Sequence, residues 1–487
     1  MFCALILANL AACGNDAPVD TTAADTTPAV TTDAYADDLP DSLNFGGETV
    51  TFLYRAEIAN EFYVEEATGD VVDDALRASI RSVEERLNVD IVAELMDGHM
   101  AAARTPYMNH ITNTIMAGDD LYDWVDLMIG NSPMLMRTGI FKNLLTNPYI
   151  DLDKPWYLSD LAESIAIDNK LYFIAGDISL GYIKDAFGIY FNTTVAENFK
   201  LESLYKLVDD GKWTLDKMME ISSIASQDVN GDTKYDENDK LGFLVHNYNH
   251  LNGFVMSTDL NVYQTTDDGL PEFTFGSDRD VSVCEKLYKA LYNTPGSFDC
   301  NLSDTTASEV GAFNHLTNMF ASDQILMMTA ELDEAVVYLR DMKSPYGILP
   351  FPKYDEVQKE YISTSRNTHN AFSMPITCAD PDMAGAVMEA LSASNHTSLL
   401  PAYFEVALKT KYSRDDDSAR MFDLIRSTMV LDFGYTYNNA LGFPITEVVW
   451  KSFKEENSIS SNVASSISSL DANLEKLLTD IRENCLN

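Results

Sequence analysis

Residues 50–54 read Val-Thr-Phe-Leu-Tyr, a pattern typical of a half-buried β-strand. Apolar side chains then recur at helical spacing over residues 75–87 and predict an amphipathic helix. A second strand is predicted at 89–93, and the short apolar run Val-Asp-Leu-Met-Ile at 125–129 predicts a third. Strands that alternate with helices in this way form parallel sheets with helical crossovers, so the sequence predicts an α/β fold.

The ends of these strands predict where a ligand binds. In open parallel sheets, ligands lie beyond the carboxyl ends of the strands. The first strand ends at Tyr54 and Arg55, and the third runs into Asn131 and Ser132. We therefore predict that these four residues line a ligand-binding cleft. For Arg55 a surface ion pair is the alternative interpretation.

Size and charge restrict the class of protein. About 440 residues follow position 47, which is too many for a single hydrophobic core and predicts two lobes. The chain has 33 Lys and Arg against 76 Asp and Glu, a net charge of −43. So negative a surface repels phosphate backbones, which excludes nucleic acid as a partner. The same charge disfavours polyanionic ligands unless a local basic pocket overrides the average.

The amino-terminal segment predicts an anchor and a tether. Leu10-Ala11-Ala12-Cys13-Gly14 closes a short apolar run and has the form of a bacterial lipoprotein cleavage box, which predicts a signal peptide at 1–12 and lipidation of Cys13. The following residues are rich in Asp, Thr, Ala and Pro, and lack Lys and Arg as far as Leu43. We therefore expect 13–47 to be a lipidated cysteine and a disordered acidic tether. The predicted location is the extracellular face of a bacterial cell membrane.

An acidic loop predicts a calcium site. Residues 228–239 place oxygen ligands at positions 1, 3, 5, 9 and 12 of a twelve-residue loop, with a backbone carbonyl at position 7. The predicted ligands are Asp228, Asn230, Asp232, Lys234 through its carbonyl, Asp236 and Asp239. Thr233 stands where such loops prefer glycine, and Asp239 is shorter than the usual glutamate, so both weaken the site. A structural Ca²⁺ is predicted, with a solvated acidic turn as the alternative.

Motifs for catalysis are missing from the sequence. It contains no G-x-S-x-G, H-E-x-x-H or phosphate-loop motif. His246 and His250 have i, i+4 spacing, but no helical signal or third ligand accompanies them, so no metal is predicted there. The sequence contains no C-x-x-C motif, and its four internal cysteines allow three disulfide pairings that the sequence does not rank. These cysteines are Cys284, Cys300, Cys378 and Cys485.

Several segments, taken in their order along the chain, resemble the extracellular solute-binding proteins of ABC importers, in the large carbohydrate-associated family. The likeness spans residues 48–440, and Trp213-Thr214 departs from the Thr-Trp order of much of that family. The segments that carry it are Tyr190-Phe191-Asn192, Trp213-Thr214-Leu215-Asp216, the loop 228–239, Gly347 to Asp355, Pro401-Ala402-Tyr403 and Asp432-Phe433-Gly434.

The resemblance implies a two-lobe, periplasmic-binding-protein-like (type II) fold with an interlobe cleft and hinge crossings. The crossings are expected near 188–192 and 361–373. Lobe I would comprise 48–187 plus 363–415, and lobe II 188–362 plus 416–487.

The same resemblance adds four residues to the predicted ligand site. Asp177 precedes the first crossing, and Glu331 follows an apolar strand in the second lobe. Arg366 and His369 lie in the second crossing. The alternatives are a turn cap for Asp177 and a helix amino-terminal carboxylate for Glu331.

The function implied is that of a monomeric, lipid-anchored receptor that closes its lobes on a solute, a sugar or oligosaccharide, and delivers it to the subunits of an ABC permease. Such a protein is not an enzyme and carries no organic cofactor. A surface-attached carbohydrate-active enzyme and a ligand-sensing adaptor for a signalling receptor are the alternative interpretations.

Overall fold

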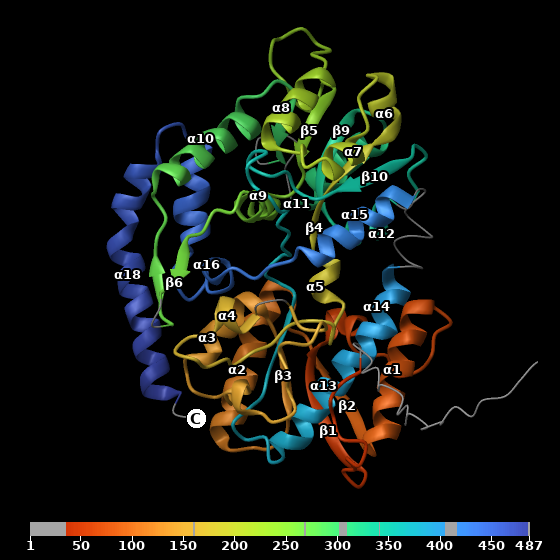
Figure 1. Cartoon of the computed structure of the whole chain (residues 1–487), viewed down its shortest axis with the longest axis vertical. Helices are drawn as coiled ribbons and strands as arrows, with labels where there is room; N and C mark the ends of the chain where they lie inside the picture. Colours follow the sequence, from red (N-terminus) through yellow and green to blue (C-terminus); the bar gives the residue numbers. More distant parts are fainter. Residues whose placement is uncertain are drawn as a thin grey trace, which may run out of the picture. The chain divides into compact units, whose positions relative to one another are not determined.

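The strand predicted at residues 50–54 is β1 (Glu48–Arg55), which lies inside a four-stranded sheet of order β11-β3-β1-β2 (Figure 1). Both β2 (Val89–Met96) and β3 (Trp124–Met128) run parallel to β1, as predicted. The fourth strand, β11 (Asn370–Ser373), comes from much later in the chain and pairs antiparallel with β3. The first sheet is therefore closed by a segment that the local pattern did not predict.

The structure is a computed structural model that describes residues 36–158, 161–266, 269–300, 309–339, 341–404 and 416–485. The predicted signal peptide, Cys13 and most of the predicted tether lie outside these ranges. Within them, no helix combines the length and the apolar composition needed to cross a membrane.

Helix α1 (Val71–Leu87) links β1 to β2 and confirms the predicted amphipathic helix. It begins after Asp70, whose side chain accepts a hydrogen bond from the Val72 amide, and ends at Asn88 in the left-handed conformation. Its buried face carries Leu76, Ile80, Val83 and Leu87. The other long helices of this part are α2 (Ala101–Ala117) and α13 (Pro381–Thr397), and α13 packs against α1 and β1.

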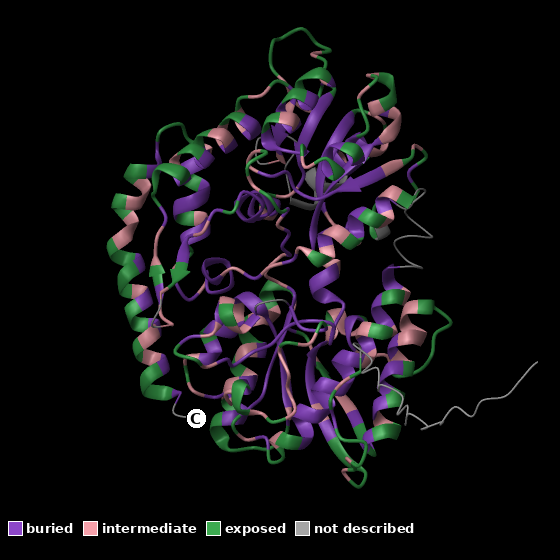
Figure 2. Ribbon diagram, viewed as in Figure 1, coloured by how far each residue is buried: buried purple, intermediate pink, exposed green. Residues whose placement is uncertain are grey.

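The second sheet has five strands in the order β10-β4-β9-β5-β8, and its interior strands are buried along their length (Figure 2). Here β5 runs parallel to β8 and β9, whereas β4 is antiparallel to both of its neighbours. The strands are β4 (Phe187–Asn192), β5 (Leu241–Val245), β8 (Ser297–Asp299), β9 (Ile325–Glu331) and β10 (Tyr346–Leu349).

Helices pack around the second sheet. They are α6 (Thr193–Asn198), α7 (Leu204–Asp209), α8 (Leu215–Ile224), α10 (Asp278–Tyr292), α11 (Glu309–Ala321), α12 (Leu332–Val337) and α15 (Asp416–Ser427). Thr214 caps α8 as predicted, because its hydroxyl accepts a hydrogen bond from the Lys217 amide. Trp213 is buried, and its indole donates to the carbonyl of Pro350 at 2.9 Å.

Shorter elements complete the chain. They are α3 (Ser132–Met136), α4 (Leu161–Ile165), α5 (Gly181–Lys184), α9 (Leu251–Ser257), the hairpin of β6 (Tyr263–Thr265) and β7 (Pro271–Phe273), α14 (Leu399–Pro401), α16 (Phe433–Thr436) and α17 (Lys451–Lys454).

Three extended segments connect the parts built on the two sheets. The segments at 186–187 and 364–365 lie antiparallel: Ala186 pairs with Ser365, and the Phe187 amide donates to the carbonyl of Thr364 at 3.0 Å. A third segment joins them where Ser363 pairs in parallel with Met429. The sequence predicted two crossings and missed the third, which carries no motif. The lobe boundaries themselves stay a prediction.

The carboxyl-terminal helix α18 (Ile459–Asn484) runs from the side of α17 to the first sheet's part of the molecule (Figure 1). At its far end Asp480 forms an ion pair with Arg137, and the side chain of Asn484 donates to the Arg137 carbonyl. The thiol of Cys485 donates to the carbonyl of Met136 at 3.2 Å. Although residues 416–487 were assigned to the second lobe, this end contacts residues assigned to the first.

The predicted tether is wrong at its carboxyl end, because residues 37–47 are packed on the body. Arg86 donates to both carboxylate oxygens of Asp37, at 2.5 and 2.7 Å, and Leu39 is buried. The Phe45 amide donates to the carbonyl of Leu87 at 2.9 Å. Composition alone predicts disorder here, but the apolar side chains near the end of this segment pack against the folded body.

We predict that Gly139→Ala destabilises the protein more than Gly118→Ala. Both glycines have positive φ, +75° and +81°, which costs an alanine about 1 kcal/mol. Only at Gly139 would the new methyl group also collide with the carbonyl of Asn484, at the end of α18. Urea unfolding is expected to show a loss of about 2–4 kcal/mol for Gly139→Ala and about 1 kcal/mol for Gly118→Ala. Equal losses of stability in the two variants would show that the end of α18 does not restrict the space at residue 139.

Candidate functional site

The carboxyl edge of the first sheet is organised by a buried ion pair. Arg55, the last residue of β1, donates from Nε to Oδ2 of Asp126 at 2.7 Å and from a terminal nitrogen to Oδ1 at 3.1 Å. Their side chains are 1% and 0% exposed. Burial acts to lower the pKa of Arg55, but the charge and hydrogen bonds of Asp126 outweigh it and raise that pKa.

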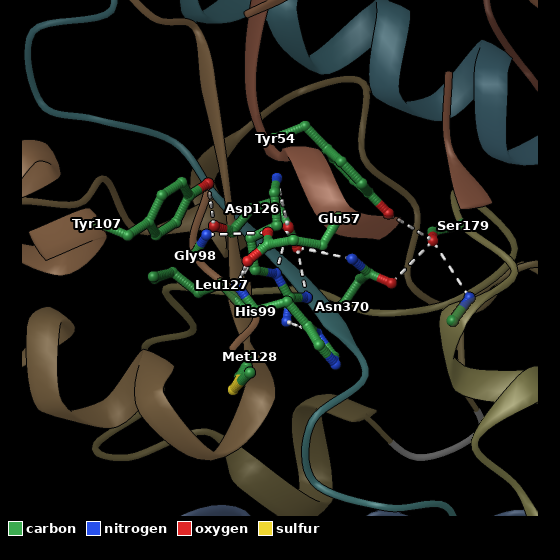
Figure 3. A network of polar contacts seen from close by, with 12 residues as sticks. Tyr54, Glu57, Gly98, His99, Tyr107, Asp126, Leu127, Met128, Ser179 and Asn370 are labelled. Atoms are coloured by element: carbon green, nitrogen blue, oxygen red, sulfur yellow. Dashed lines mark hydrogen bonds and ion pairs between the residues drawn. The ribbon is translucent and has the colours of Figure 1, made fainter. Parts of the chain in front are cut away.

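Polar contacts extend from this ion pair to neighbouring elements (Figure 3). The amide of Asn370, in β11, donates to Oδ1 of Asp126 at 2.9 Å, and its oxygen accepts from the hydroxyl of Ser179 at 3.0 Å. The hydroxyl of Tyr107, in α2, donates to the backbone carbonyl of Asp126 at 2.8 Å. The carboxylate of Asp126 thus holds β1, β3 and β11 together, and its backbone carbonyl holds α2, at the edge where the sequence predicts a ligand.

Several predicted ligand residues are part of this interior, which corrects the prediction that they contact a ligand. Tyr54 is fully buried and stacks on Phe62, with ring centroids 5.0 Å apart. Arg55 forms an ion pair, as the alternative interpretation held, but a buried one. Ser132 is buried and donates to the carbonyl of Met128 at 3.3 Å. Each is oriented inward because its polar atom has a partner in the core.

Asp177 is also buried, but it lies between elements of both halves. It accepts a hydrogen bond from the hydroxyl of Tyr182, and its Oδ2 lies 2.5 Å from Nδ1 of His396. Arg426, in α15, approaches the same oxygen at 3.4 Å. Asp177 is therefore neither a ligand contact nor a turn cap. It anchors α15 to the first sheet's part of the molecule.

His369 is corrected in the same way. Its Nδ1 lies 2.6 Å from the hydroxyl of Ser365 and 2.8 Å from the carbonyl of Arg366, and burial lowers its pKa to about 4. A neutral, buried imidazole in this place holds the turn of the second crossing. It has no exposed face for a ligand.

The remaining predicted residues are partly exposed. Arg366 is 31% exposed and lies 3.4 Å from Oε1 of Glu331. Glu331 occupies the amino-terminal cap position of α12, which matches its alternative interpretation, yet it also faces the crossing. Burial, followed by the nearby Glu334, raises the pKa of Glu331. Asn131 accepts a hydrogen bond from the side chain of Asn439 at 2.9 Å.

Residues that the sequence did not indicate complete this group. The Gly130 amide donates to the carbonyl of Asn367 at 3.1 Å, so the loop after β3 adjoins the second crossing. The backbone amide of Asn367 in turn donates to the hydroxyl of Tyr435 at 3.1 Å. Tyr248 is 41% exposed, and its ring lies edge-on to that of Trp450 at 6.2 Å.

Arg104 and His99 belong to the same edge. One terminal nitrogen of Arg55, Nη1, lies 3.3 Å from Nδ1 of His99 and donates to the carbonyl of Thr368 at 3.1 Å. Arg104 donates to the carbonyl of His99 at 2.9 Å. The two parts of the chain thus present partly exposed amides, guanidinium groups and an aromatic ring around the crossings. These groups have the hydrogen-bonding capacity that polar solutes require.

The acidic loop is closed by hydrogen bonds between its own side chains and backbone amides. The carboxylate of Asp228 accepts from the amides of Gly231 and Thr233 at 2.6 and 2.9 Å, and Thr233 adopts the left-handed φ of +70° where glycine is preferred. The side-chain oxygens of the loop thus accept hydrogen bonds from backbone amides of the same loop. Among the described residues, no group of three or more His, Cys, Asp or Glu is positioned to hold a metal ion. Calcium binding stays a prediction.

Comparison with known proteins shows the fold. No protein-family model matches the sequence, and no curated protein does. Among solved structures, the cyclic α-maltosyl-1,6-maltose binding protein of Arthrobacter globiformis is similar, with a TM-score of 0.57, 12% identity and 88% of this chain and 100% of that chain covered.

Two further solved structures give the same result. A sugar transporter protein of Rhizobium etli in an open conformation has a TM-score of 0.56 at 14% identity, covering 89% of this chain and 99% of that chain. An ABC substrate-binding protein of Listeria monocytogenes in complex with cycloalternan has a TM-score of 0.51 at 13% identity, covering 90% and 99%. The predicted two-lobe α/β fold is confirmed.

We expect Arg55→Met to lower the free energy of unfolding by about 3–5 kcal/mol, because Asp126 would remain buried without its partner. Replacing both residues, as Arg55→Met with Asp126→Leu, is expected to recover part of that loss. Arg81→Met is the matched control: its ion pair with Glu85 is exposed and contributes less than about 1 kcal/mol. Urea titration measures all three. A loss for Arg55→Met no larger than the control's would contradict the structural role.

For the acidic loop, EDTA is expected to lower the melting temperature of the wild-type protein, and Asp228→Ala is expected to abolish that sensitivity. Asp90→Ala, at an exposed position of β2, serves as the control and should respond to EDTA as the wild type does. Differential scanning calorimetry gives the comparison. A wild-type melting curve that chelation leaves in place would establish the acidic-turn alternative.

Proposed function

We propose that this chain is a lipid-anchored extracellular solute-binding protein that holds a sugar or oligosaccharide between its two lobes and delivers it to an ABC permease. The observation that carries the proposal is the convergence of partly exposed polar residues from both halves around the crossings. Asn131 comes from the first sheet's part, Glu331 from the second, and Arg366 from the segment that joins them. The proteins of similar fold, by their descriptions, bind or transport sugars.

Lobe closure is supported by the construction of the hinge. Charged groups of the two halves meet beside the crossings, where Lys184 lies 3.0 Å from Glu61 and 4.0 Å from Asp333. The hydroxyl of Thr368 donates to Asp185 at 2.9 Å. Hinge closure changes the backbone angles of a few residues in such connecting segments, and a ligand that touches both halves shifts the equilibrium toward the closed form.

The chemistry of the exposed groups fits a carbohydrate. Asn131 and Asn439 carry amides that both donate and accept, as sugar hydroxyls require. The exposed ring of Tyr248 offers a flat apolar face against which a sugar ring can stack. The anchor at Cys13, the membrane location and the monomeric state are supported by the sequence pattern and by the resemblance alone.

Isothermal titration calorimetry against a panel of mono- and oligosaccharides, with peptides as a second panel, tests this function. We expect one-to-one binding of a sugar without turnover, together with a smaller radius of gyration in small-angle scattering. Asn131→Ala should weaken binding by about three- to tenfold, the effect of one or two lost hydrogen bonds. The exposed Arg81→Gln should leave the affinity unchanged. Accumulation of a hydrolysis product would instead favour the enzyme alternative, and no heat with any sugar would refute sugar capture.

A further inference from the structure

Among the described residues, Arg104 has no carboxylate partner, although the chain has 43 more acidic than basic residues. It lies in the first turn of α2 and is partly buried, and the one hydrogen bond that its side chain makes to a described residue runs from Nε to the carbonyl of His99. Within the described part of the chain its two terminal nitrogens make neither a hydrogen bond nor an ion pair. Burial, followed by the charges of Arg366 and Arg55, lowers the pKa of Arg104. Its surroundings are therefore positive rather than neutralised.

Glu57, a carboxylate beside the start of α2, is already committed to other groups. Glu57 accepts hydrogen bonds from the amides of Gly98, His99 and Met100, at 3.0 to 3.2 Å. Burial acts to raise the pKa of Glu57, but these amides lower it to about 2. The Glu57 carboxylate is thus ionised but hydrogen-bonded to the backbone that precedes α2, and it makes no hydrogen bond or ion pair with Arg104.

Arg366 is a second incompletely paired cation at the same place. Only one of its terminal nitrogens reaches Glu331, at 3.4 Å, and the described residues accept no hydrogen bond from Nε or the other terminal nitrogen. The two carboxylates that face Arg366 have raised pKa values, so they carry less negative charge at neutral pH than ordinary carboxylates do. Burial raises the pKa of Asp185 to about 7, and burial with Glu334 raises that of Glu331.

Contacts place the two arginines on one surface. Arg104 donates to the backbone carbonyl of His99. Arg55 contacts the imidazole of His99 and also donates to the carbonyl of Thr368, which lies two residues after Arg366. Tyr248 interacts electrostatically with both arginines. Burial, Arg55 and Arg104 also lower the pKa of His99 to about 4, so the imidazole between them is neutral.

We infer that the ligand is an acidic carbohydrate, a sugar or oligosaccharide bearing a carboxylate, and that this carboxylate is held by Arg104 from the first lobe and Arg366 from the crossing. The inference rests on the proposed function and specifies its substrate class. A guanidinium group presents paired donors that match the two oxygens of a carboxylate. Closure around a neutral sugar would bury Arg104 without a counter-charge, and this cost discriminates against neutral ligands.

A matched pair of probes tests the inference by calorimetry: oligogalacturonides and oligoglucuronides, each compared with its methyl ester, in which the charge alone is removed. Sulfated and neutral oligosaccharides are two further arms. We expect the acid to bind at least about tenfold tighter than the ester, and its affinity to fall as the salt concentration rises. Tight binding of the sulfated arm without the acid would overturn the carboxylate assignment.

Variants locate the effect. Arg104→Gln should weaken binding of the acid by about ten- to hundredfold and change binding of the ester by less than about twofold. Arg81→Gln, on the exposed face of α1, should change neither, and melting curves of both variants confirm that they fold.

Two outcomes separate the proposals. If neutral sugars or the esters bind as tightly as the acids, or if Arg104→Gln leaves acid binding unchanged, the acidic-ligand inference is wrong and sugar capture stands. If no sugar of any arm binds, both are wrong.

Discussion

The ion pair of Arg55 with Asp126 is the constraint on which the arrangement of the first sheet depends. A carboxylate inside a strand is tolerated only when it is paired and hydrogen-bonded, and Asp126 meets this condition through Arg55 and Asn370. Asn370 begins β11, which the chain reaches only after it has built the second sheet. A single buried charge therefore ties the end of β1 to a segment more than 300 residues away, and the crossing just before β11 takes its position from that bond.

This arrangement separates structural charges from functional ones. Arg55 is satisfied on every side and cannot exchange its partner for a ligand. Arg104 and Arg366 lie within a few contacts of it, but each keeps donors that no described residue pairs. The interior pair thus supplies a rigid support, while the neighbouring arginines supply the chemistry that a solute can recognise. Preorganised donors of this kind bind without a large loss of side-chain freedom.

Local patterns predicted the local structure well. Periodicity located β1, α1, β2 and β3, and the cap at Thr214 was correct, because each depends on neighbours within a few residues. The ligand residues were harder to predict, since burial is decided by distant partners. The strand end at Tyr54 and Arg55 indicated the correct edge of the sheet, but not that both side chains are oriented inward. Asp126, a lone carboxylate in the apolar run at 125–129, was the available signal that Arg55 had a buried partner.

Other features left no signal in the sequence. The third crossing at 428–430 pairs with Ser363 through backbone atoms, which any side chain permits. The unpaired state of Arg104 is a property of what surrounds it, so no local motif could show it. The acidic composition before residue 47 predicted disorder throughout, but Leu39 and the bond from Arg86 to Asp37 dock the last residues of this segment on the body.

That docking decides which half of the molecule bears a mechanical load. Asp37 and Leu39 attach to α1 and its neighbours, so any pull on the chain upstream of them is transmitted to the part that contains β1. Were the protein held at a membrane through its amino terminus, that part would stay stationary relative to the bilayer. The part with the five-stranded sheet would then move relative to the bilayer when the two parts close.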